Sequence, residues 1–313
     1  MPTCNGAPFL HRQLQSLMAQ TERDWRIIAR DDGSVDGTWD ILRDFAGSHP
    51  DRVHVLTDSR HVGLCTGVSE LMEASRAEYI MFCDQDDVWM PNKIEKTLEG
   101  MKRLEAEKGR TAPLLVHSDL MVVDKDLVPI CDSFWSYQGI VPENAGRFNR
   151  QLIANTVTGC AMMINRPLLV LAMPIPGMAL VHDWWIAQVA AAFGTIACVR
   201  EPLIAYRQHG KNQIGAKGYS VANFMKRIWN YATSKEERGR VNNLAARSRL
   251  QVLAFRERYA SKLNVRQAAI LAGYLRLCAA PPLLRFFIMA QFGFWRPGLL
   301  RNITMGMKYR FSG

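Results

Sequence analysis

Two apolar segments of this sequence, each predicted to form a buried strand, end in clusters of aspartate. The clusters are Asp31 and Asp32 after residues 25–29, and Asp84, Asp86 and Asp87 after residues 79–83. Carboxylates at the carboxyl ends of sheet strands lie where open α/β folds bind their ligands. Several anions held close together repel one another and are stabilised by a bound cation. Mg²⁺ and Mn²⁺ bind carboxylate and phosphate oxygens, so the clusters predict a divalent metal that holds a diphosphate.

Strands and helices alternate along the first third of the chain. Apolar spacing predicts helices over 9–18, 39–45, 63–74 and 91–104, and strands over 25–29, 53–56 and 79–83. This alternation is typical of βαβ units and predicts an α/β fold with a mostly parallel sheet, although the pattern weakens beyond Pro113. Residues 1–6 have the composition of the loop that follows a first strand. That strand is either absent or lies before the numbered start.

Length and composition favour a globular protein of the cytoplasm. With 313 residues, 48% of them hydrophobic, the chain can form one large domain and an appendage. Seven scattered cysteines with no Cys-x-x-Cys pair suit a reducing compartment. The N-terminus has no apolar signal sequence, and no uncharged run reaches the ~18 residues that a membrane span requires.

The net charge of +10 is concentrated in the last third of the chain. Residues 1–210 contain 20 Lys and Arg against 26 Asp and Glu, whereas residues 211–313 contain 19 against 3. Basic residues mixed with Trp, Phe and Leu on predicted helices suit the surface of an anionic membrane. Nucleic acid is the competing partner, but no nucleic-acid fold signature supports it, and we predict no nucleic-acid binding. The remaining alternative is a helical appendage with solvated charges.

Six strings, in this order, resemble the family 2 glycosyltransferases, which use nucleotide sugars and have the GT-A fold. The strings are residues 2–6, 31–38, 84–89, 158–160, 182–185 and 206–212. The resemblance extends to about residue 215 and is greatest to the rhamnosyltransferase-like branch that builds bacterial surface polysaccharides. It implies a Rossmann-like catalytic domain over 1–215, with helices on both faces of its sheet, followed by a basic helical region over 216–313.

The resemblance also implies a role for each matching residue. The nucleotide pocket would contain Pro2, Thr3, Asn5, Asp84 and either Asp31 or Asp32 as acceptor of a hydrogen bond from the base imide. The Mg²⁺ or Mn²⁺ site would contain Asp86, Asp87 and His209. The sugar and acceptor would meet Thr158, Gly159, Trp184 and Trp185. Asp183 would be the general base.

The implied chemistry is inverting sugar transfer. Displacing a nucleoside diphosphate from the anomeric carbon builds negative charge on the leaving phosphate, which a metal neutralises. A carboxylate on the opposite side of the sugar takes the proton of the attacking hydroxyl, which is worth ~10²- to 10⁴-fold in rate. We therefore expect a UDP-, dTDP- or GDP-linked hexose or deoxyhexose, rhamnose included, as donor. We expect a glycan or lipid-linked acceptor at the inner face of the cell membrane.

Two departures from the family pattern affect these roles. Cys4 stands where the family usually has an aromatic residue, so stacking on the base from this position is in question. His182 replaces the acidic residue that commonly precedes the base, and a neutral imidazole would repel Asp183 less. The Gln-x-x-Arg-Trp signature of processive synthases does not follow Asp183, which predicts transfer of one sugar per encounter.

Each assignment has a structural alternative. Asp183 could cap a helix that begins at Trp184, and His209 could be a loop residue without a metal. Trp184 and Trp185 are adjacent, so only one of them can face the core of one helix. Two other functions stay open: a metal-dependent nucleotidyl- or phosphotransferase, whose glycine-rich phosphate loop is absent here, and a non-catalytic nucleotide-binding scaffold subunit.

Overall fold

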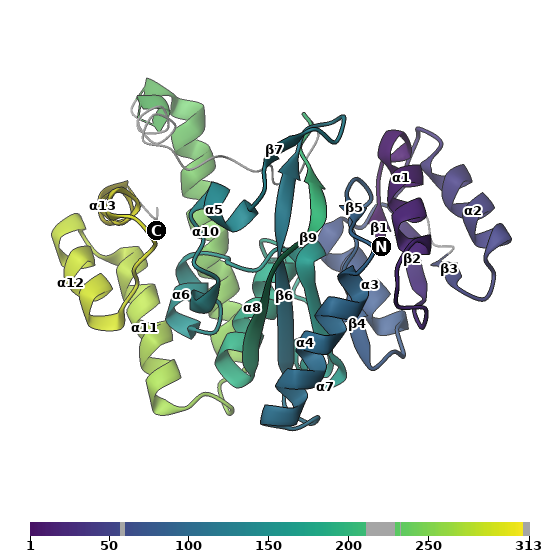
Figure 1. Cartoon of the computed structure of the whole chain (residues 1–313). Helices are drawn as coiled ribbons and strands as arrows, with labels where there is room; N and C mark the ends of the chain where they lie inside the picture. Colours follow the sequence, from purple (N-terminus) through teal and green to yellow (C-terminus); the bar gives the residue numbers. More distant parts are fainter. Residues whose placement is uncertain (57–59, 211–228, 232, 309–313) are drawn as a thin grey trace.

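The computed structural model describes residues 1–56, 60–210, 229–231 and 233–308 (Figure 1). Its first part is a small parallel sheet in the order β1 (Pro2–Thr3), β2 (Ile27–Asp31) and β3 (Val53–Leu56). Helices α1 (Ala7–Met18), α2 (Thr38–Ser48) and α3 (Leu64–Ala74) alternate with these strands, as the apolar spacing predicts. Residues 2–3 form a strand themselves, because Pro2 and Thr3 pair in register with Arg30 and Asp31.

The larger sheet is mixed, so the prediction of a mostly parallel sheet holds only for the small one. Its strands are β4 (Tyr79–Met81), β5 (Val88–Trp89), β6 (Leu114–Val123), β7 (Pro129–Cys131), β8 (Met162–Asn165) and β9 (Thr195–Arg207). They run in the order β4-β8-β6-β9-β5, with β7 beside β6. Among the strands that the structure describes in this sheet, only β6 and β9 pair in parallel.

Alternate residues of β6 face two helical layers. Leu114 and Val116 pack with Met101 of α4 (Lys93–Lys108) on one face. Leu115 packs on the other face, in the core that contains Trp185 of α8 (His182–Phe193). Helices α6 (Phe148–Ile153) and α7 (Arg166–Ala172) contribute to the same core, whereas Phe134 and Trp135 of α5 (Phe134–Gln138) pack in a second core with Leu120. The strand period of two thus sandwiches the sheet between helices.

The basic C-terminal region is a set of helices that shares its core with the preceding domain. They are α10 (Lys235–Arg258), α11 (Val265–Ala279), α12 (Pro282–Phe292) and α13 (Leu299–Lys308). The ring of Phe255 in α10 lies 5.4 Å from that of Phe148 and 5.6 Å from that of Trp185. The predicted boundary at residue 215 lies outside the described residues. Among the residues that the structure describes, no helix has the length and apolar composition needed to cross a bilayer.

Candidate active site

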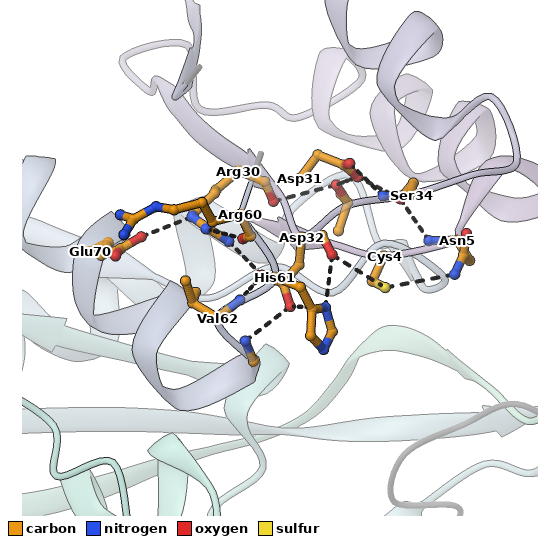
Figure 2. Close-up of polar contacts among 12 residues, drawn as sticks. Cys4, Asn5, Arg30, Asp31, Asp32, Ser34, Arg60, His61, Val62 and Glu70 are labelled. Atoms are coloured by element: carbon orange, nitrogen blue, oxygen red, sulfur yellow. Dashed lines mark hydrogen bonds and ion pairs between the residues drawn. The ribbon is translucent and has the colours of Figure 1, made fainter. Parts of the chain in front are cut away.

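The carboxylate of Asp31 is hydrogen-bonded to residues of the neighbouring loops (Figure 2). Its carboxylate accepts hydrogen bonds from Thr3 Oγ1 at 3.0 Å, Ser34 Oγ at 2.5 Å and Ser34 N at 2.8 Å. Ser34 in turn accepts from the backbone N–H of Asn5, and the Asn5 side chain accepts from Val35 N. Thr3, Asn5 and Asp31, three of the residues expected to line a nucleotide pocket, are therefore joined by one hydrogen-bond network between the ends of β1 and β2.

Asp32 accepts a hydrogen bond at every side of its carboxylate. Oδ1 accepts from Arg30 Nη1 at 2.7 Å and Val62 N at 2.8 Å, and Oδ2 lies 3.0 Å from both Gly63 N and His61 Nδ1. Burial alone would raise the pKa of Asp32, but these bonds outweigh it and hold the pKa below its ordinary value. The imidazole of His61 is 75% exposed, so it is the partner that an incoming donor could displace most readily.

Arg30 is a buried residue that holds this cluster in place. It was not identified from the sequence. Its guanidinium is 1% exposed and pairs with Glu70 of α3 at 2.8 Å as well as with Asp32. A third contact, at 2.5 Å, goes to the carbonyl of Arg60 (Figure 2). An Arg inside an apolar strand is the only sequence signal, because a buried guanidinium requires acidic and carbonyl partners.

Gln85 connects the second acidic cluster to the N-terminal loop. Its side chain accepts from Cys4 N at 2.9 Å and donates to Cys4 O at 2.9 Å. Gly6 provides the space, since a Cβ there would lie 2.2 Å from the Gln85 side chain. The two clusters, ~50 residues apart in sequence, are thereby held in fixed relative positions.

The structure brings Asp86 and His209 together, as the predicted metal site requires. Asp86 Oδ2 lies 2.8 Å from His209 Nε2. The imidazole stacks on Phe9 of α1 with 4.5 Å between ring centroids, and the Arg207 guanidinium lies 5.0 Å from the same Phe9 ring. His209 is therefore held on two sides, in a defined place at the end of β9.

Asp87 is more deeply buried than Asp86. It is completely buried and accepts a hydrogen bond from Arg207 N at 3.1 Å. Its carboxylate, that of Asp84 and the Cys160 thiol lie within 4.8 Å of one another. Mg²⁺ and Mn²⁺ disfavour thiol ligands, and burial raises the pKa of Cys160 well above its ordinary value. The thiol makes this buried group a poor set of ligands as a whole, and Asp87 as a metal ligand stays a prediction.

Lys93 offsets this buried negative charge and was also missed from the sequence. It is 0% exposed, its ammonium lies 4.2 Å from the centroid of the Trp89 ring, and its Nζ has no hydrogen-bond partner among the described residues. Burial lowers the pKa of Lys93 to about 8, although the neighbouring Cys160, Cys83 and Asp87 oppose that shift. A Lys at the start of an amphipathic helix is ordinarily solvated, so its position gave no signal.

Asp183 lies in the first turn of α8, close to the second acidic cluster. The helix begins at His182 with Val181 as its N-cap, so Asp183 is not the cap. Its Oδ2 accepts from Gly159 N at 2.9 Å and its Oδ1 from Trp184 N at 2.6 Å. Burial raises the pKa of Asp183 to about 6, against the opposing effect of these bonds. Burial also lowers the pKa of His182 to about 4, so this imidazole is neutral, as expected.

Charge repulsion shows that the acidic groups share one region. Burial raises the pKa of Asp84 to about 7, with further contributions from the carboxylates of Asp86 and Asp183. Asp86, which follows β4, and Asp183, at the start of α8, thus both act on Asp84. Such an arrangement is stabilised by a cation or by hydrogen-bond donors on a ligand.

The two adjacent tryptophans divide as their spacing predicts. Trp185 is 0% exposed and donates from Nε1 to the Ala172 carbonyl at 2.9 Å, so it is a core residue and cannot form a sugar wall. Trp184 is half-buried and donates from Nε1 to the Gln151 carbonyl.

Thr158 occupies the N-cap position of the turn that presents the Gly159 N–H to Asp183. A Cβ on Gly159 would lie 2.8 Å from His182 Nε2, so the absence of a side chain permits this approach.

The comparisons with known proteins identify the family of the chain. A family model described as "Glycosyl transferase family 2" matches residues 1–169. The chain belongs to this family. The match confirms the resemblance and contains four of the six ordered strings, residues 2–6, 31–38, 84–89 and 158–160.

Relatives and a solved structure extend the match. The chain is 30% identical over 166 residues to the putative teichuronic acid biosynthesis glycosyltransferase TuaG of Bacillus subtilis, a match that covers 53% of this chain and 60% of TuaG. It is 26% identical over 230 residues to the dTDP-rhamnosyl transferase RfbG of Shigella flexneri, covering 69% and 74%. The mannosyltransferase PcManGT from Pyrobaculum calidifontis, solved with GDP-Man and Mn²⁺, superposes with a TM-score of 0.52 at 18% identity, covering 97% of this chain and 82% of PcManGT. The fold is therefore GT-A.

Proposed function

We propose that this protein is an inverting, non-processive glycosyltransferase. It moves a hexose or deoxyhexose from a nucleotide diphosphate sugar to a glycan or lipid-linked acceptor of a surface polysaccharide. The single observation that carries the proposal is the convergence of Asp183 with Asp84 and Asp86, with the pKa of Asp183 raised to about 6. The relative RfbG, a dTDP-rhamnosyl transferase, supports dTDP-rhamnose as the first donor to test.

In this proposal the nucleotide lies against the loops after β1 and β2. Asp32 accepts the hydrogen bond of the base imide, in place of the one from the exposed His61 ring. Asp31 holds the loop after β2 in place through Thr3 and Ser34, and the Asn5 side chain adds a hydrogen bond from the N–H of Val35 in the same loop. Exchange of one partner for another keeps both oxygens of Asp32 satisfied, which limits the cost of binding.

The residues that would hold Mg²⁺ or Mn²⁺ are Asp86 and His209, with Asp84 beside them. They fit such an ion, because carboxylate and imidazole are suitable ligands and because the raised pKa of Asp84 reflects negative charge that a cation would offset. When bound, the ion would neutralise charge on the leaving diphosphate. The mannosyltransferase PcManGT, which was solved with Mn²⁺ and a nucleotide sugar, supports the same expectation.

Asp183 acts as the general base on the acceptor hydroxyl. The Gly159 and Trp184 N–H groups hold the carboxylate in one orientation, which fixes where the proton is received. A pKa of about 6 keeps the group ionised at neutral pH and still basic enough to accept a proton in the transition state. Trp184 and Thr158 adjoin the groups that hold this carboxylate, so the sugar and acceptor would bind beside them.

The test combines binding and transfer. Thermal-shift assays with UDP, dTDP, GDP and ADP, each with and without Mn²⁺, should show stabilisation of ~2.7 kcal/mol at ~100 times the Kd of the preferred nucleotide. Sugar transfer from the corresponding donor should be lost in Asp183→Asn with nucleotide binding retained. Full transfer by a folded Asp183→Asn protein would refute the mechanism. Nucleotide binding without transfer to any acceptor would favour the scaffold alternative.

A membrane-bound acceptor requires the protein to work at a lipid surface. We include peripheral association with the inner face of the cell membrane in the proposed function, because the last third of the chain combines strong positive charge with aromatic and aliphatic side chains.

A further inference from the structure

We propose that the outward faces of α12 and α13 form a docking surface for anionic lipid. We call this surface the α12–α13 face and define it by its exposed apolar side chains, Leu283, Leu284, Phe287, Leu299 and Met307. This surface would be the part of the chain that meets the membrane carrying the acceptor. Its biological purpose rests on the proposed function.

The apolar side chains of this face are unusually exposed. Leu283 is 87% exposed, Phe287 65% and Leu299 75%. On the same helix as the first two, Ile288 and Met289 are completely buried in the main core. Helix α12 is therefore apolar on both sides, one packed against protein and the other uncovered within the described residues. Contiguous exposed apolar residues of this kind mark an interaction site.

Helices α12 and α13 are packed against each other, so their exposed apolar residues belong to one rigid unit. A Cβ on Gly306 of α13 would lie 2.3 Å from Cζ of Phe286, which places the two helices in close contact. The buried Arg285 donates from Nε to the Ala280 carbonyl at 2.7 Å and from Nη1 to the Gly306 carbonyl at 3.5 Å. The two helices are thus already folded and packed before they meet lipid, so binding would not require a disordered segment to fold.

Charge decides between lipid and a second copy of this chain as the occupant. Residues 259–313 contain eight Lys and Arg and no Asp or Glu. Lys262, Arg266 and Arg276, on or next to α11, are exposed. Two copies that met through this face would bring two acid-free basic segments together and repel each other. Anionic headgroups attract the same segment, and the exposed Leu and Phe side chains supply the apolar part of binding.

The position of the face leaves the proposed donor site open. Figure 1 shows α12 and α13 on one side of the larger sheet and β1–β3 with their helices on the other. A protein docked through α12 and α13 would keep its nucleotide-binding loops away from the bilayer, where a nucleotide sugar could reach them.

The experiment measures binding of the full chain to vesicles, without nucleotide. Co-sedimentation with phosphatidylcholine vesicles, with and without phosphatidylglycerol, should show binding that requires the anionic lipid and weakens with salt. The double variant Leu283→Ser/Phe287→Ser should bind at least about tenfold more weakly, because two large apolar side chains are lost from the bilayer. Val170→Ser, at a 65% exposed position on α7, is the matched control and should bind like wild type.

Three results would overturn the inference. They are equal binding to neutral vesicles, wild-type vesicle binding by the double variant, and a wild-type dimer in light scattering that the double variant abolishes. Circular dichroism and the nucleotide thermal shift establish that the variant is folded, and Leu299→Ser provides an independent substitution in α13. Because vesicle binding needs no donor, its failure is distinguishable from failure of the transferase proposal.

Discussion

The pH dependence of transfer gives the sharpest test of Asp183 as the base. Its pKa of about 6 lies above the ordinary value of 3.8, because burial destabilises the charged form more than the hydrogen bonds from Gly159, Trp184 and Asn155 stabilise it. A general base must be ionised, so activity should fall as the pH drops through this value. An unperturbed aspartate would keep its full activity down to about pH 5.

The size of the effect follows from the ionised fraction. One pH unit below a pKa of about 6 only ~10% of Asp183 is ionised, against ~90% one unit above it, so kcat/KM should fall roughly tenfold between pH 7 and pH 5 and tenfold again for each further unit. The assay measures initial rates of nucleotide diphosphate release at low donor concentration, where kcat/KM reports the groups of the free enzyme. Circular dichroism at each pH confirms that the fold is intact.

Asn155→Ala supplies the specific control. Its side-chain hydrogen bond lowers the pKa of Asp183, so the substitution should move the acid limb to higher pH and leave the rate at high pH nearly unchanged. Loss of a merely structural contact would lower the rate at every pH. A flat profile down to pH 5, or an acid limb that stays in place in Asn155→Ala, would show that another group controls the reaction.

Four further substitutions test separate parts of the structure. Asp183→Asn should raise the free energy of unfolding at pH 7.5 by up to ~3 kcal/mol, as measured by urea titration. The pKa of Asp183 is higher in the folded than in the unfolded state, so its ionisation lowers the stability of the wild type as the pH rises from about 4 to 6. An unchanged urea midpoint would contradict the burial of this charge. Gln85→Ala should cost about 1 kcal/mol and raise the donor KM more than it lowers kcat, as steady-state kinetics would show. Asp32→Ala should lower stability by ~2 kcal/mol because Arg30 loses a buried partner; urea titration decides, and a neutral result would mean that Glu70 suffices. Phe255→Ala should cost ~3–5 kcal/mol in one cooperative transition, whereas two transitions in calorimetry would show an independent C-terminal domain.

The sequence predicted those parts of the fold that depend on local periodicity. The helices α1 to α4 have apolar stripes of period 3.6, and each was located from them. The strands β2, β3 and β4 are short apolar runs that end near polar loops, and they were located to within a few residues. Each pattern involves residues close in sequence, so no long-range information was needed.

Long-range pairing could not be predicted in the same way. The antiparallel partner of β4 is β8, roughly 80 residues later, and the apolar run at 161–164 is compatible with either direction. The burial of Asp87 and Lys93 beside Cys160 also depends on segments distant in sequence. Motif matching assigned Asp87 by its place in the string, which could not show that its side chain is completely buried. The pair Asp86 and His209 was found because both lie in strings that the family resemblance covers.

The C-terminal helices position the proposed base although they contain none of the family strings. Gln251 of α10 is 1% exposed; its Oε1 accepts from Leu180 N at 2.8 Å and its Nε2 donates to Gln188 of α8 at 3.0 Å. These bonds fix both the segment that enters α8 and the helix itself, and Asp183 lies between the two contact points. The charge distribution separates residues 216–313 from the rest of the chain, but the packing of α10 joins its own part of that segment to the base. A surface that docks on lipid and a carboxylate that meets a lipid-linked acceptor would thus be connected through the packed helices α11 and α10, which lets the docked orientation determine where the acceptor hydroxyl is presented.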